Sequence, residues 1–330
     1  MESFVDYLPR AGAILLTGHE HPDGDCLGSQ IGLFHLLREL GHEVRILLPD
    51  APIRSLEFLC RSTPVGIHEP GRELPPCDTL VLVDCAELGR LGTMRDSVAR
   101  RAPRIAVIDH HVGSDRADGS IGFVDVEAAA SGELVWRLYR ELGRRPTAVA
   151  AEALYCALVA DTGWFRYSNT DAEVFEIAAD LVACGADPSV IYDRLYRSQP
   201  AQSVGILAEG IARSEIEMDG RVGFVAISHG LLERASRVGF DLDQVMEPLR
   251  SVDGIEVVVM LKELAGDRVK VSLRASGEID VQRIAKSFGG GGHKKAAGVT
   301  LELSMAEART RIQGAIAAAL AARDPASGLP

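Results

Sequence analysis

The tripeptide Asp109-His110-His111 places one carboxylate and two imidazoles directly after an apolar run, Arg104–Ile108. That run has the length and composition of a buried strand, so the three polar residues fall at its carboxyl end. Two other apolar runs in the first half of the chain also end in acidic or histidine residues. Because open α/β sheets bind ligands at the carboxyl ends of their strands, we predict one shared functional site there.

The residues at these strand ends could hold metal ions. Ala13–Thr17 runs into the segment 19–25, Thr79–Val83 runs into an aspartate, and a helix-like segment, Ala153–Ala160, delivers another. Together with the tripeptide, these segments supply the candidate residues His19, Asp23, Asp25, Asp84, Asp109, His110, His111 and Asp161. Mixed histidine and carboxylate ligands suit Mn²⁺, with Mg²⁺, Co²⁺ or Zn²⁺ as alternatives. Because one ion needs fewer ligands, the set favours two ions bridged by a carboxylate, an arrangement that hydrolyses phosphate esters.

Each of these residues also has a structural interpretation. A single aspartate after a strand is most often a helix N-cap or a turn residue. The metal prediction therefore depends on the joint occurrence of five acids and three histidines at successive strand ends. Cys26 and Cys85 each follow a candidate aspartate. We interpret them as small buried hydrophobic residues, because structural zinc cysteines come in closely spaced pairs.

Composition limits the class of protein. The chain has 330 residues, of which 47% are hydrophobic and 25% charged, and this length allows two domains with separate cores. No apolar run reaches the roughly 18–20 residues that span a bilayer, and no signal-peptide pattern opens the sequence. Six scattered cysteines predict reduced thiols and a cytoplasmic setting. The net charge of −12 argues against a broad basic surface for long nucleic acid but allows a short anionic substrate.

The order of expected elements indicates an α/β fold in the first half. The strand Ala13–Thr17 is followed by a helix over 24–40, whose apolar residues recur on one face. Further strands are expected at Val44–Leu48, Thr79–Val83 and Arg104–Ile108. This alternation favours a doubly wound, mostly parallel sheet with helices on both faces.

The pattern over 131–213 is mainly helical. Thr170 and Glu173 have the spacing of a capping box, which predicts a helix start between them. Asp187 followed by Pro188 predicts a second start, with an N-cap and then proline at the first helical position.

Two hairpins, a glycine-rich loop and a terminal helix then indicate a smaller α+β domain. The hairpins are expected over 214–227 and 255–274, each with a glycine-containing turn. The expected parts of the chain are a catalytic, metal-binding domain at 1–187, a helical linker at 188–213 and a substrate-binding domain at 214–330. We expect the active site in the cleft between the two domains.

The second domain contains a run of four glycines, Gly289–Gly292, that is followed directly by His293. A run of glycines could be a flexible linker, but linkers are seldom followed by His-Lys-Lys-Ala-Ala-Gly and a strand. Glycine lets backbone N–H groups approach phosphate oxygens closely, and a histidine can bond a phosphate or stack on a base. Arg274 offers a planar fork for a further phosphate contact. We therefore predict a small anion-binding loop in this domain.

The order of these motifs resembles that of the DHH phosphoesterase family. Residues 19–25 match its first motif, Asp84 its second, Asp109-His110-His111 its third and Asp161-Thr162-Gly163 its fourth. Residues 213–330 resemble the DHH-associated domain through Arg274-Ala275-Ser276 and the glycine-rich stretch 290–298. The resemblance covers nearly the whole chain, and four ordered motifs make it specific at the level of the superfamily.

The resemblance implies a role for each candidate residue. One Mn²⁺ ion would be held by His19, Asp23 and Asp84. The second would be held by Asp25, Asp84, His110 and Asp161, so that Asp84 is the bridge. The implied catalytic residues are Asp84, Asp109, His110 and His111, with Asp109 orienting a ligand histidine and His111 facing the substrate phosphate. The implied substrate-binding residues are His111, Arg274, Ser276, Gly290, Gly291, Gly292 and His293.

The two-domain length is similar to that of the nanoRNase branch. Its members degrade very short RNA and linear dinucleotides such as pApA, and several remove the 3′-phosphate of 3′-phosphoadenosine 5′-phosphate (pAp). By resemblance alone, a homodimer is also expected.

Three other functions are weighed against this one. A manganese-dependent pyrophosphatase or polyphosphatase shares the metal motifs but has a differently built second domain. An exonuclease for longer single strands would need an extended basic channel with aromatic platforms, which this sequence does not supply. A non-catalytic nucleotide sensor would not need a complete set of metal ligands.

Overall fold

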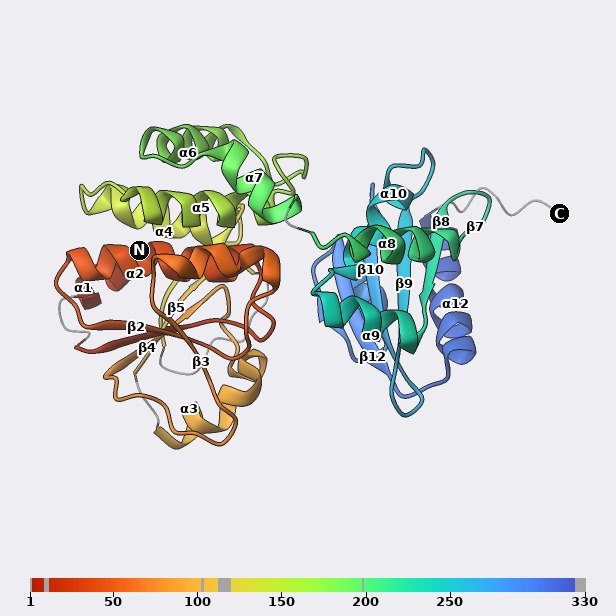
Figure 1. The fold of residues 1–330 in the computed structure, drawn as a ribbon, viewed down its shortest axis with the longest axis horizontal. Coiled ribbons are helices and arrows are strands. Elements are labelled where there is room, and N and C mark those ends of the chain that lie inside the picture. The colour runs from red at the N-terminus through yellow and green to blue at the C-terminus, as the bar shows by residue number, and fades with distance from the viewer. Residues whose placement is uncertain (1, 9–11, 102–103, 112–119, 198, 324–330) are drawn as a thin grey trace. The chain divides into compact units, whose positions relative to one another are not determined.

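The computed structural model describes residues 2–8, 12–101, 104–111, 120–197 and 199–323 (Figure 1). The chain forms two units, residues 1–198 and 199–330, each with its own sheet and core. The boundary falls between α7 (Pro188–Tyr196) and α8 (Gln202–Ala212), so the segment expected as a linker contributes one helix to each unit. Among the described residues, no helix is both long and apolar enough to cross a membrane.

The first unit is built on a six-stranded sheet in which every neighbouring pair of strands is parallel. Its strands are β1 (Ile14–Thr17), β2 (Val44–Leu48), β3 (Val65–Ile67), β4 (Thr79–Val83), β5 (Arg104–Asp109) and β6 (Ile121–Val124). Their spatial order is β3-β2-β1-β4-β5-β6, so the chain builds outward from β1 and then returns to its other side. The order switches between β1 and β4, and such a switch point is where open α/β sheets bind ligands.

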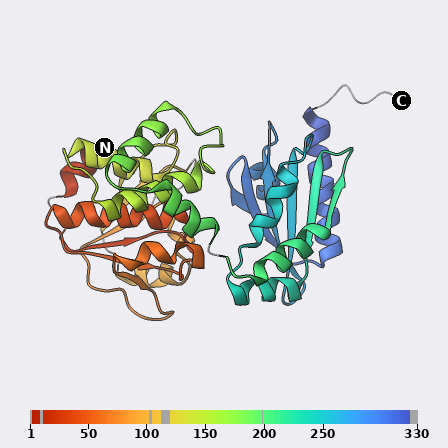
Figure 2. The same ribbon diagram turned by 45° about the horizontal axis from the view of Figure 1, so that its top comes forward.

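Helices cover both faces of this sheet, which confirms the fold class expected from the sequence (Figures 1 and 2). They are α1 (Glu2–Tyr7), α2 (Gly24–Glu39), α3 (Arg95–Arg101), α4 (Ser131–Glu141), α5 (Ala148–Asp161), α6 (Ala172–Ala183) and α7, with the 3-10 segments η2 (Arg54–Arg61) and η3 (Leu88–Met94). Alternate residues of a strand point to opposite faces. Val81 and Val83 of β4 therefore join the core of α2, α4 and α5, whereas Leu80 and Leu82 pack with Val98 of α3. Burial on both faces explains why the strands are almost continuously apolar.

A row of glycines lets α2 pack closely against α5. Gly24, Gly28 and Gly32 recur every fourth residue and so lie on one face of α2. A Cβ atom on Gly28 would lie 2.3 Å from the backbone oxygen of Ala153, and one on Gly24 would lie 2.8 Å from the Cβ atom of Ala160. Only glycine permits this approach, which holds the beginning of α2 beside the end of α5. Both helix ends carry candidate metal residues.

The structure confirms both helix starts expected from capping patterns but corrects the capping residue of one. The capping box of Thr170 and Glu173 is wrong, because the N-cap of α6 is Asp171, whose carboxylate accepts a backbone N–H at 3.0 Å. Glu173 pairs instead with an arginine of α4 at 2.9 Å, so its carboxylate is drawn away from the helix terminus. The other start is confirmed, since Asp187 caps α7 and Pro188 is its first residue.

The second unit contains a six-stranded mixed sheet with the order β11-β12-β10-β9-β8-β7. Its strands are β7 (Ser214–Glu217), β8 (Val222–Ile227), β9 (Val257–Leu264), β10 (Arg268–Ala275), β11 (Gly291–Gly292) and β12 (Ala296–Leu301). Its helices are α8, α9 (His229–Val238), α10 (Met246–Arg250), α11 (Val281–Lys286) and α12 (Met305–Arg323), with the 3-10 segment η4 (Leu242–Val245). Both expected hairpins form as the antiparallel pairs β7–β8 and β9–β10, whereas β8 and β9 are parallel.

We predict that Gly28→Ala lowers the free energy of unfolding by about 1–3 kcal/mol, because the added methyl group overpacks the contact between α2 and α5. Gly205→Ala is the matched control, since a Cβ atom at this position of α8 meets no described atom within 4 Å. The control should instead stabilise the protein by about 0.5–1 kcal/mol through the higher helix propensity of alanine. Urea unfolding followed by circular dichroism measures both effects. Equal effects of the two substitutions would contradict the close contact.

Candidate metal centre

Asp84 is the residue on which three histidines converge. Its Oδ2 atom lies 3.2 Å from Nε2 of His19, and its Oδ1 atom lies 3.5 Å from both Nε2 of His110 and Nδ1 of His111. Asp84 itself is only 2% exposed. The two oxygens of one buried carboxylate thus face histidines from two different strand ends, as a carboxylate shared by two ions would.

The backbone of Asp84 adopts a conformation that is uncommon for a residue other than glycine. Its φ angle is +60°, in the left-handed region, which costs an ordinary residue about 1–2 kcal/mol. The backbone N–H of Asp84 donates to the carbonyl of Ile108 at 2.8 Å, so the turn after β4 is tied to β5. Conformations of this kind gather at functional sites, where the surrounding structure holds them.

His110 joins a second group, formed with the ends of α2 and α5. Its Nε2 atom lies 3.1 Å from Oδ2 of Asp161 and 3.6 Å from Oδ2 of Asp25. One ligand atom from each of these three residues lies within 4.8 Å of the others. Asp161 is the last residue of α5, and Asp25 is the second residue of α2. The glycine-mediated contact between these helices therefore brings both carboxylates to the same histidine.

Backbone carbonyls fix the position of the proton on two of the histidines. Nδ1 of His19 lies 2.8 Å from the carbonyl of Glu20, and Nδ1 of His110 lies 3.1 Å from the carbonyl of Ala128. Because a carbonyl only accepts hydrogen bonds, each neutral ring must donate from Nδ1 and present the lone pair of Nε2.

These lone pairs face carboxylate oxygens, and that juxtaposition fits a cation between them. The Nε2 atoms of His19 and His110 lie 3.2 Å from Asp84 and 3.1 Å from Asp161, respectively. Two ligands at right angles, each about 2.1 Å from one ion, would lie about 3 Å apart. The donor set of imidazole nitrogens and carboxylate oxygens therefore suits divalent metal ions.

The charges of the centre also favour cations. Burial opposes a positive charge on His110, yet the carboxylates of Asp161 and Asp84 raise its pKa to about 12. Burial likewise opposes the negative charge of Asp84, but hydrogen bonds with His110 and His19 hold its pKa well below the usual range. The shift of His110 reflects the negative potential of the carboxylates around it, which a proton or a metal ion can offset, whereas the shift of Asp84 reflects the histidines beside it.

Asp109 holds His111, not the ligand candidate His110. Its Oδ1 atom accepts hydrogen bonds from Nδ1 of His111 at 2.7 Å and from the backbone N–H of the same residue at 3.2 Å. The carbonyl of Ala128 orients His110 instead. The side chain of His111 is 17% exposed against 8% for His110. Of the two neighbouring histidines, His111 is therefore the more accessible to a substrate.

Asp23 lies at the margin of the centre. Its Oδ1 atom accepts the backbone N–H of Cys26 at 2.9 Å, so it is the N-cap of α2. Its Oδ2 atom lies 3.8 Å from Nε2 of His19, and its side chain is 54% exposed. Asp23 can therefore cap α2 through Oδ1 and still offer Oδ2 to a metal ion.

The sulfur of Cys26 lies beside candidate metal ligands, which our interpretation of Cys26 as a small buried hydrophobic residue did not predict. The residue is buried, and its thiol is free, as are those of the other cysteines. Its sulfur belongs to a group with His19 and Asp84 in which the ligand atoms lie within 4.8 Å of one another. Gln30 donates to this sulfur at 3.3 Å and thereby fixes its position.

Ser131, which our sequence analysis did not identify as functional, holds two candidate carboxylates. Its hydroxyl donates to Oδ1 of Asp84 at 3.0 Å, and its backbone N–H donates to Oδ2 of Asp25 at 2.7 Å. The N–H of Gly132 adds a bond to Oδ1 of Asp25 at 3.0 Å. Asp25 thus satisfies the first N–H groups of α4, whose N-cap residue Ala130 has no side-chain acceptor. The sequence feature that could have revealed this role is the start of α4, where Ala130 has no side chain that can cap the helix.

The predicted anion-binding residues of the second unit lie at one end of its sheet. Arg274, near the end of β10, is paired with Ala296 of β12. Ser276 is exposed and follows β10 directly, with its backbone N–H donating to the backbone carbonyl of Glu256 at 2.8 Å. The exposed His293 closes the turn between β11 and β12 through a backbone N–H bond to Ala296 at 2.6 Å.

The glycine run is an ordered hairpin and not a linker. β11 (Gly291–Gly292) pairs with β12. A Cβ atom on Gly290 would lie 2.3 Å from the carbonyl of Gly298, and one on Gly292 would lie 2.5 Å from that of Ala296. Close backbone approach therefore requires glycine at both positions, whereas a Cβ atom on Gly291 would meet no described atom within 4 Å.

Asp243 is a second residue that the sequence analysis missed. Its Oδ2 atom lies 2.6 Å from Nη2 of Arg274, and its Oδ1 atom lies 2.7 Å from Nζ of Lys262. Burial opposes the charge of Asp243, but Lys262 and Arg274 keep its pKa below the usual value. The carboxylate of Asp243 thus holds the guanidinium of Arg274 in place.

Known domains match both units of the chain. Residues 13–159 match the DHH family, N-terminal domain, and residues 239–322 match the DHHA1 domain. The first match begins at β1 and ends within α5, so it includes Asp84 and the Asp109-His110-His111 tripeptide.

Relatives extend the match over nearly the whole chain. A bifunctional oligoribonuclease and PAP phosphatase of Thermus thermophilus is 33% identical over 307 residues, covering 92% of this chain and 89% of the relative. A protein of the same description from Bacillus subtilis is 28% identical and covers 87% and 89%. The crystal structure of an exopolyphosphatase-related protein from Bacteroides fragilis matches with a TM-score of 0.85 and 25% identity, over 95% of this chain and 94% of that one. With its own DHH and DHHA1 domains, this chain therefore belongs to the DHH phosphoesterase family.

Proposed function

We propose that this protein is a two-metal, Mn²⁺-dependent phosphoesterase. Its substrates would be short oligoribonucleotides and linear dinucleotides such as pApA, which it hydrolyses to mononucleotides, and pAp, which it hydrolyses to AMP. Two relatives are named as bifunctional oligoribonuclease and PAP phosphatase, which supports this combination of substrates. The observation that carries the proposal is the buried Asp84 carboxylate, whose two oxygens face His19 on one side and His110 on the other.

Two ligand sets share this carboxylate in the proposed centre. They are His19, Asp23 and Asp84 for one ion, and Asp25, Asp84, His110 and Asp161 for the other. When bound, such ions lower the pKa of a water molecule and offset the charge on phosphoryl oxygens. Ser131 and Gly132 hold the carboxylates of Asp84 and Asp25 through hydrogen bonds, which reduces the repulsion between them.

His111 is the proposed contact to the reacting phosphate. Asp109 holds the proton on Nδ1 of His111, which leaves Nε2 for the substrate. When the ring carries a second proton, Nε2 can donate a hydrogen bond to a phosphoryl oxygen and stabilise the charge that develops there.

The nucleotide is proposed to bind the second domain through its anion-binding residues. They are Arg274, Ser276, Gly290, Gly291, Gly292 and His293. The guanidinium of Arg274, held by Asp243, can form paired hydrogen bonds with a phosphate, and the exposed imidazole of His293 can bond a phosphate or stack on a base.

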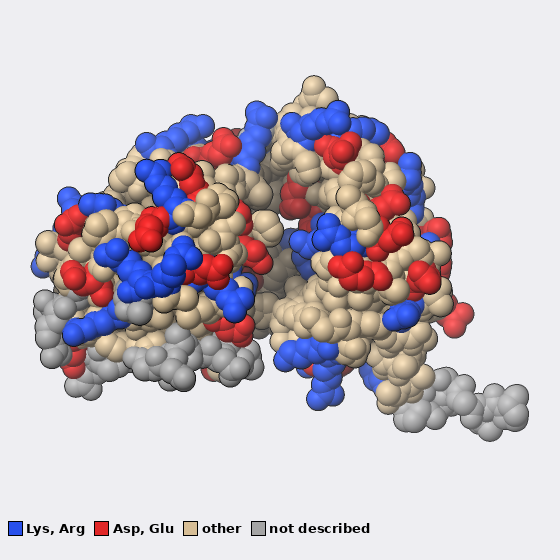
Figure 3. Space-filling view, turned by 90° about the horizontal axis from the view of Figure 1, so that it is seen from below, with Lys and Arg blue, Asp and Glu red and all other residues tan. Residues whose placement is uncertain are grey.

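Surface charge supports a short substrate. Basic and acidic side chains are interspersed on the face seen in Figure 3, and the chain as a whole has a net charge of −12. Long nucleic acids are held by broad basic surfaces, so we propose no such partner. The cytoplasmic setting and the homodimer expected from the sequence stay predictions.

The proposed function is tested by Mn²⁺-dependent turnover of pApA, pAp, a longer single-stranded RNA and pyrophosphate, with Asp84→Ala as the inactive control. Release of AMP from pApA or pAp by the wild type alone is the expected result. Cleavage of pyrophosphate alone would assign the chain to the pyrophosphatases. Tight nucleotide binding without turnover of any substrate would instead indicate a sensor.

We predict that Asp84→Asn lowers kcat by more than about 100-fold, which is the upper end of the effect expected for residues that only orient metal ligands. Asparagine tolerates the left-handed backbone, so this variant should fold like the wild type and isolate the loss of charge. Asp96→Asn, on the exposed side of α3, is the matched control and should keep full activity. Turnover is measured over a range of Mn²⁺ concentrations. Recovery of Asp84→Asn at high Mn²⁺ would contradict the bridging role.

We also predict that Asp243→Asn raises KM for pAp by about tenfold or more, because the guanidinium of Arg274 loses a charged hydrogen bond that positions it. A small chromogenic phosphodiester lacks the nucleotide and should be hydrolysed at the wild-type rate. The control is Asp267→Asn in the exposed turn between β9 and β10. Equal losses on pAp and on the chromogenic ester would mean that Asp243 supports the fold and not nucleotide binding.

A further inference from the structure

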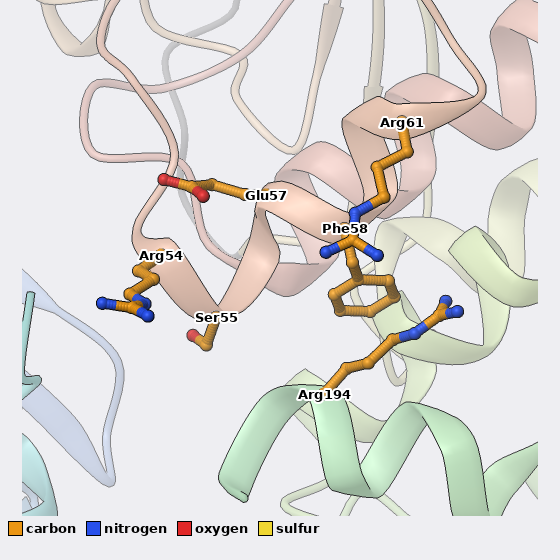
Figure 4. Close-up of a pocket in the computed structure, with 6 residues that line it drawn as sticks. All are labelled: Arg54, Ser55, Glu57, Phe58, Arg61 and Arg194. Atoms are coloured by element: carbon orange, nitrogen blue, oxygen red, sulfur yellow. The ribbon is translucent and has the colours of Figure 1, made fainter. Parts of the chain in front are cut away.

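A pocket lies between η2 and α7 of the first unit, apart from the metal residues (Figure 4). Its volume is about 200 Å³, and its lining residues are Arg54, Ser55, Glu57, Phe58, Arg61 and Arg194. Figure 4 shows the ring of Phe58 between the side chains of Arg61 and Arg194, with Ser55 and Arg54 on the other side of the pocket. Three of the six lining residues are thus arginines, in a chain whose net charge is −12.

The positive charges of this pocket are only partly neutralised. Arg194 forms an ion pair with Glu152, and its guanidinium lies 5.1 Å from the centre of the Phe58 ring. Neither Arg54 nor Arg61 has an ion-pair or hydrogen-bond partner for its side chain among the residues that the structure describes. Glu57 adds one carboxylate to the lining, so the three arginines still leave an excess of positive charge that would attract an anion.

The pocket belongs to the same edge of the sheet as the metal centre. η2 follows the carboxyl end of β2, the strand next to β1, and His19 follows the carboxyl end of β1. The loop before η2 is tied to the first motif, because Asp50 accepts a hydrogen bond from the backbone N–H of His21 at 2.9 Å. Helix α7 packs on η2 and supplies Arg194. A substrate anchored at the metal centre could therefore extend toward this pocket along one edge.

We propose that this pocket binds a further phosphate group of an oligoribonucleotide, away from the bond that is cleaved. The proposal rests on the proposed function and adds a preference for chain length to it. Guanidinium forks match phosphate oxygens, Ser55 adds a hydroxyl donor, and the small volume suits one phosphate better than a polypeptide segment. A mononucleotide such as pAp carries only two phosphates, and we expect it to be hydrolysed at the metal centre without this pocket. Only substrates with more phosphates would use the pocket.

The test is the double variant Arg54→Ala/Arg61→Ala, which leaves the Arg194–Glu152 ion pair intact. The matched control is Arg45→Ala/Arg72→Ala, two exposed arginines of the same unit that pair with Glu43 and Glu69. We expect the double variant to lower kcat/KM for a pentaribonucleotide about tenfold, mainly through KM, and to leave pAp within about twofold of the wild type. An unchanged pentaribonucleotide reaction, or an equal loss on pAp, would overturn the proposal.

A binding measurement separates this proposal from the proposed function. Fluorescence anisotropy of a labelled pentaribonucleotide, recorded with EDTA so that no turnover occurs, should show weaker binding to the double variant than to the wild type and the control. That result would support the pocket even if the wild type cleaved none of the substrates, in which case the proposed function alone would fail. Equal binding by all three proteins would overturn the pocket. Displacement of the RNA by an acidic peptide as effectively as by unlabelled RNA would also overturn it, in favour of a protein partner.

Discussion

Mutual repulsion of buried carboxylates is the constraint around which the first unit is organised. Asp25, Asp84 and Asp109 are almost fully buried, and Asp161 lies 3.1 Å from His110, which also faces Asp25 and Asp84. Each buried acid has donors of its own: the first N–H groups of α4 for Asp25, histidines and Ser131 for Asp84, and His111 for Asp109. These donors hold the cluster together but leave it strongly negative, so its remaining requirement is for cations.

Two features of the fold, the order of the strands and the close packing of two helices, bring this cluster together. The strand order places the ends of β1 and β4 side by side at the point where the sheet reverses its direction of growth. The glycines of α2 then allow α5 to approach so closely that Asp161, at its end, reaches the residues that follow β5. A substitution far from any ligand, such as a larger residue at Gly28, would therefore disturb the centre through helix packing.

Much of this architecture could be predicted from the sequence, because the chemistry-bearing residues follow continuous apolar runs. The bounds of β2 and β4 are those expected, whereas β3 and β6 were missed because they are short edge strands with partly exposed residues and a glycine each. The residues that orient the site were missed for a different reason. Ser131 is 47 residues from Asp84, and Asp243 is 31 residues from Arg274, so no local pattern marks either contact. Asp109 was expected to orient a ligand histidine, and only the folded backbone shows that its partner is His111.

The proposal that Asp84 bridges two ions is tested most directly by anomalous X-ray diffraction from crystals grown with Mn²⁺. We predict two anomalous peaks on opposite sides of the Asp84 carboxylate, one within bonding distance of Nε2 of His19 and the other within bonding distance of Nε2 of His110. A single peak under saturating Mn²⁺, or two peaks that do not share Asp84, would contradict the proposed centre.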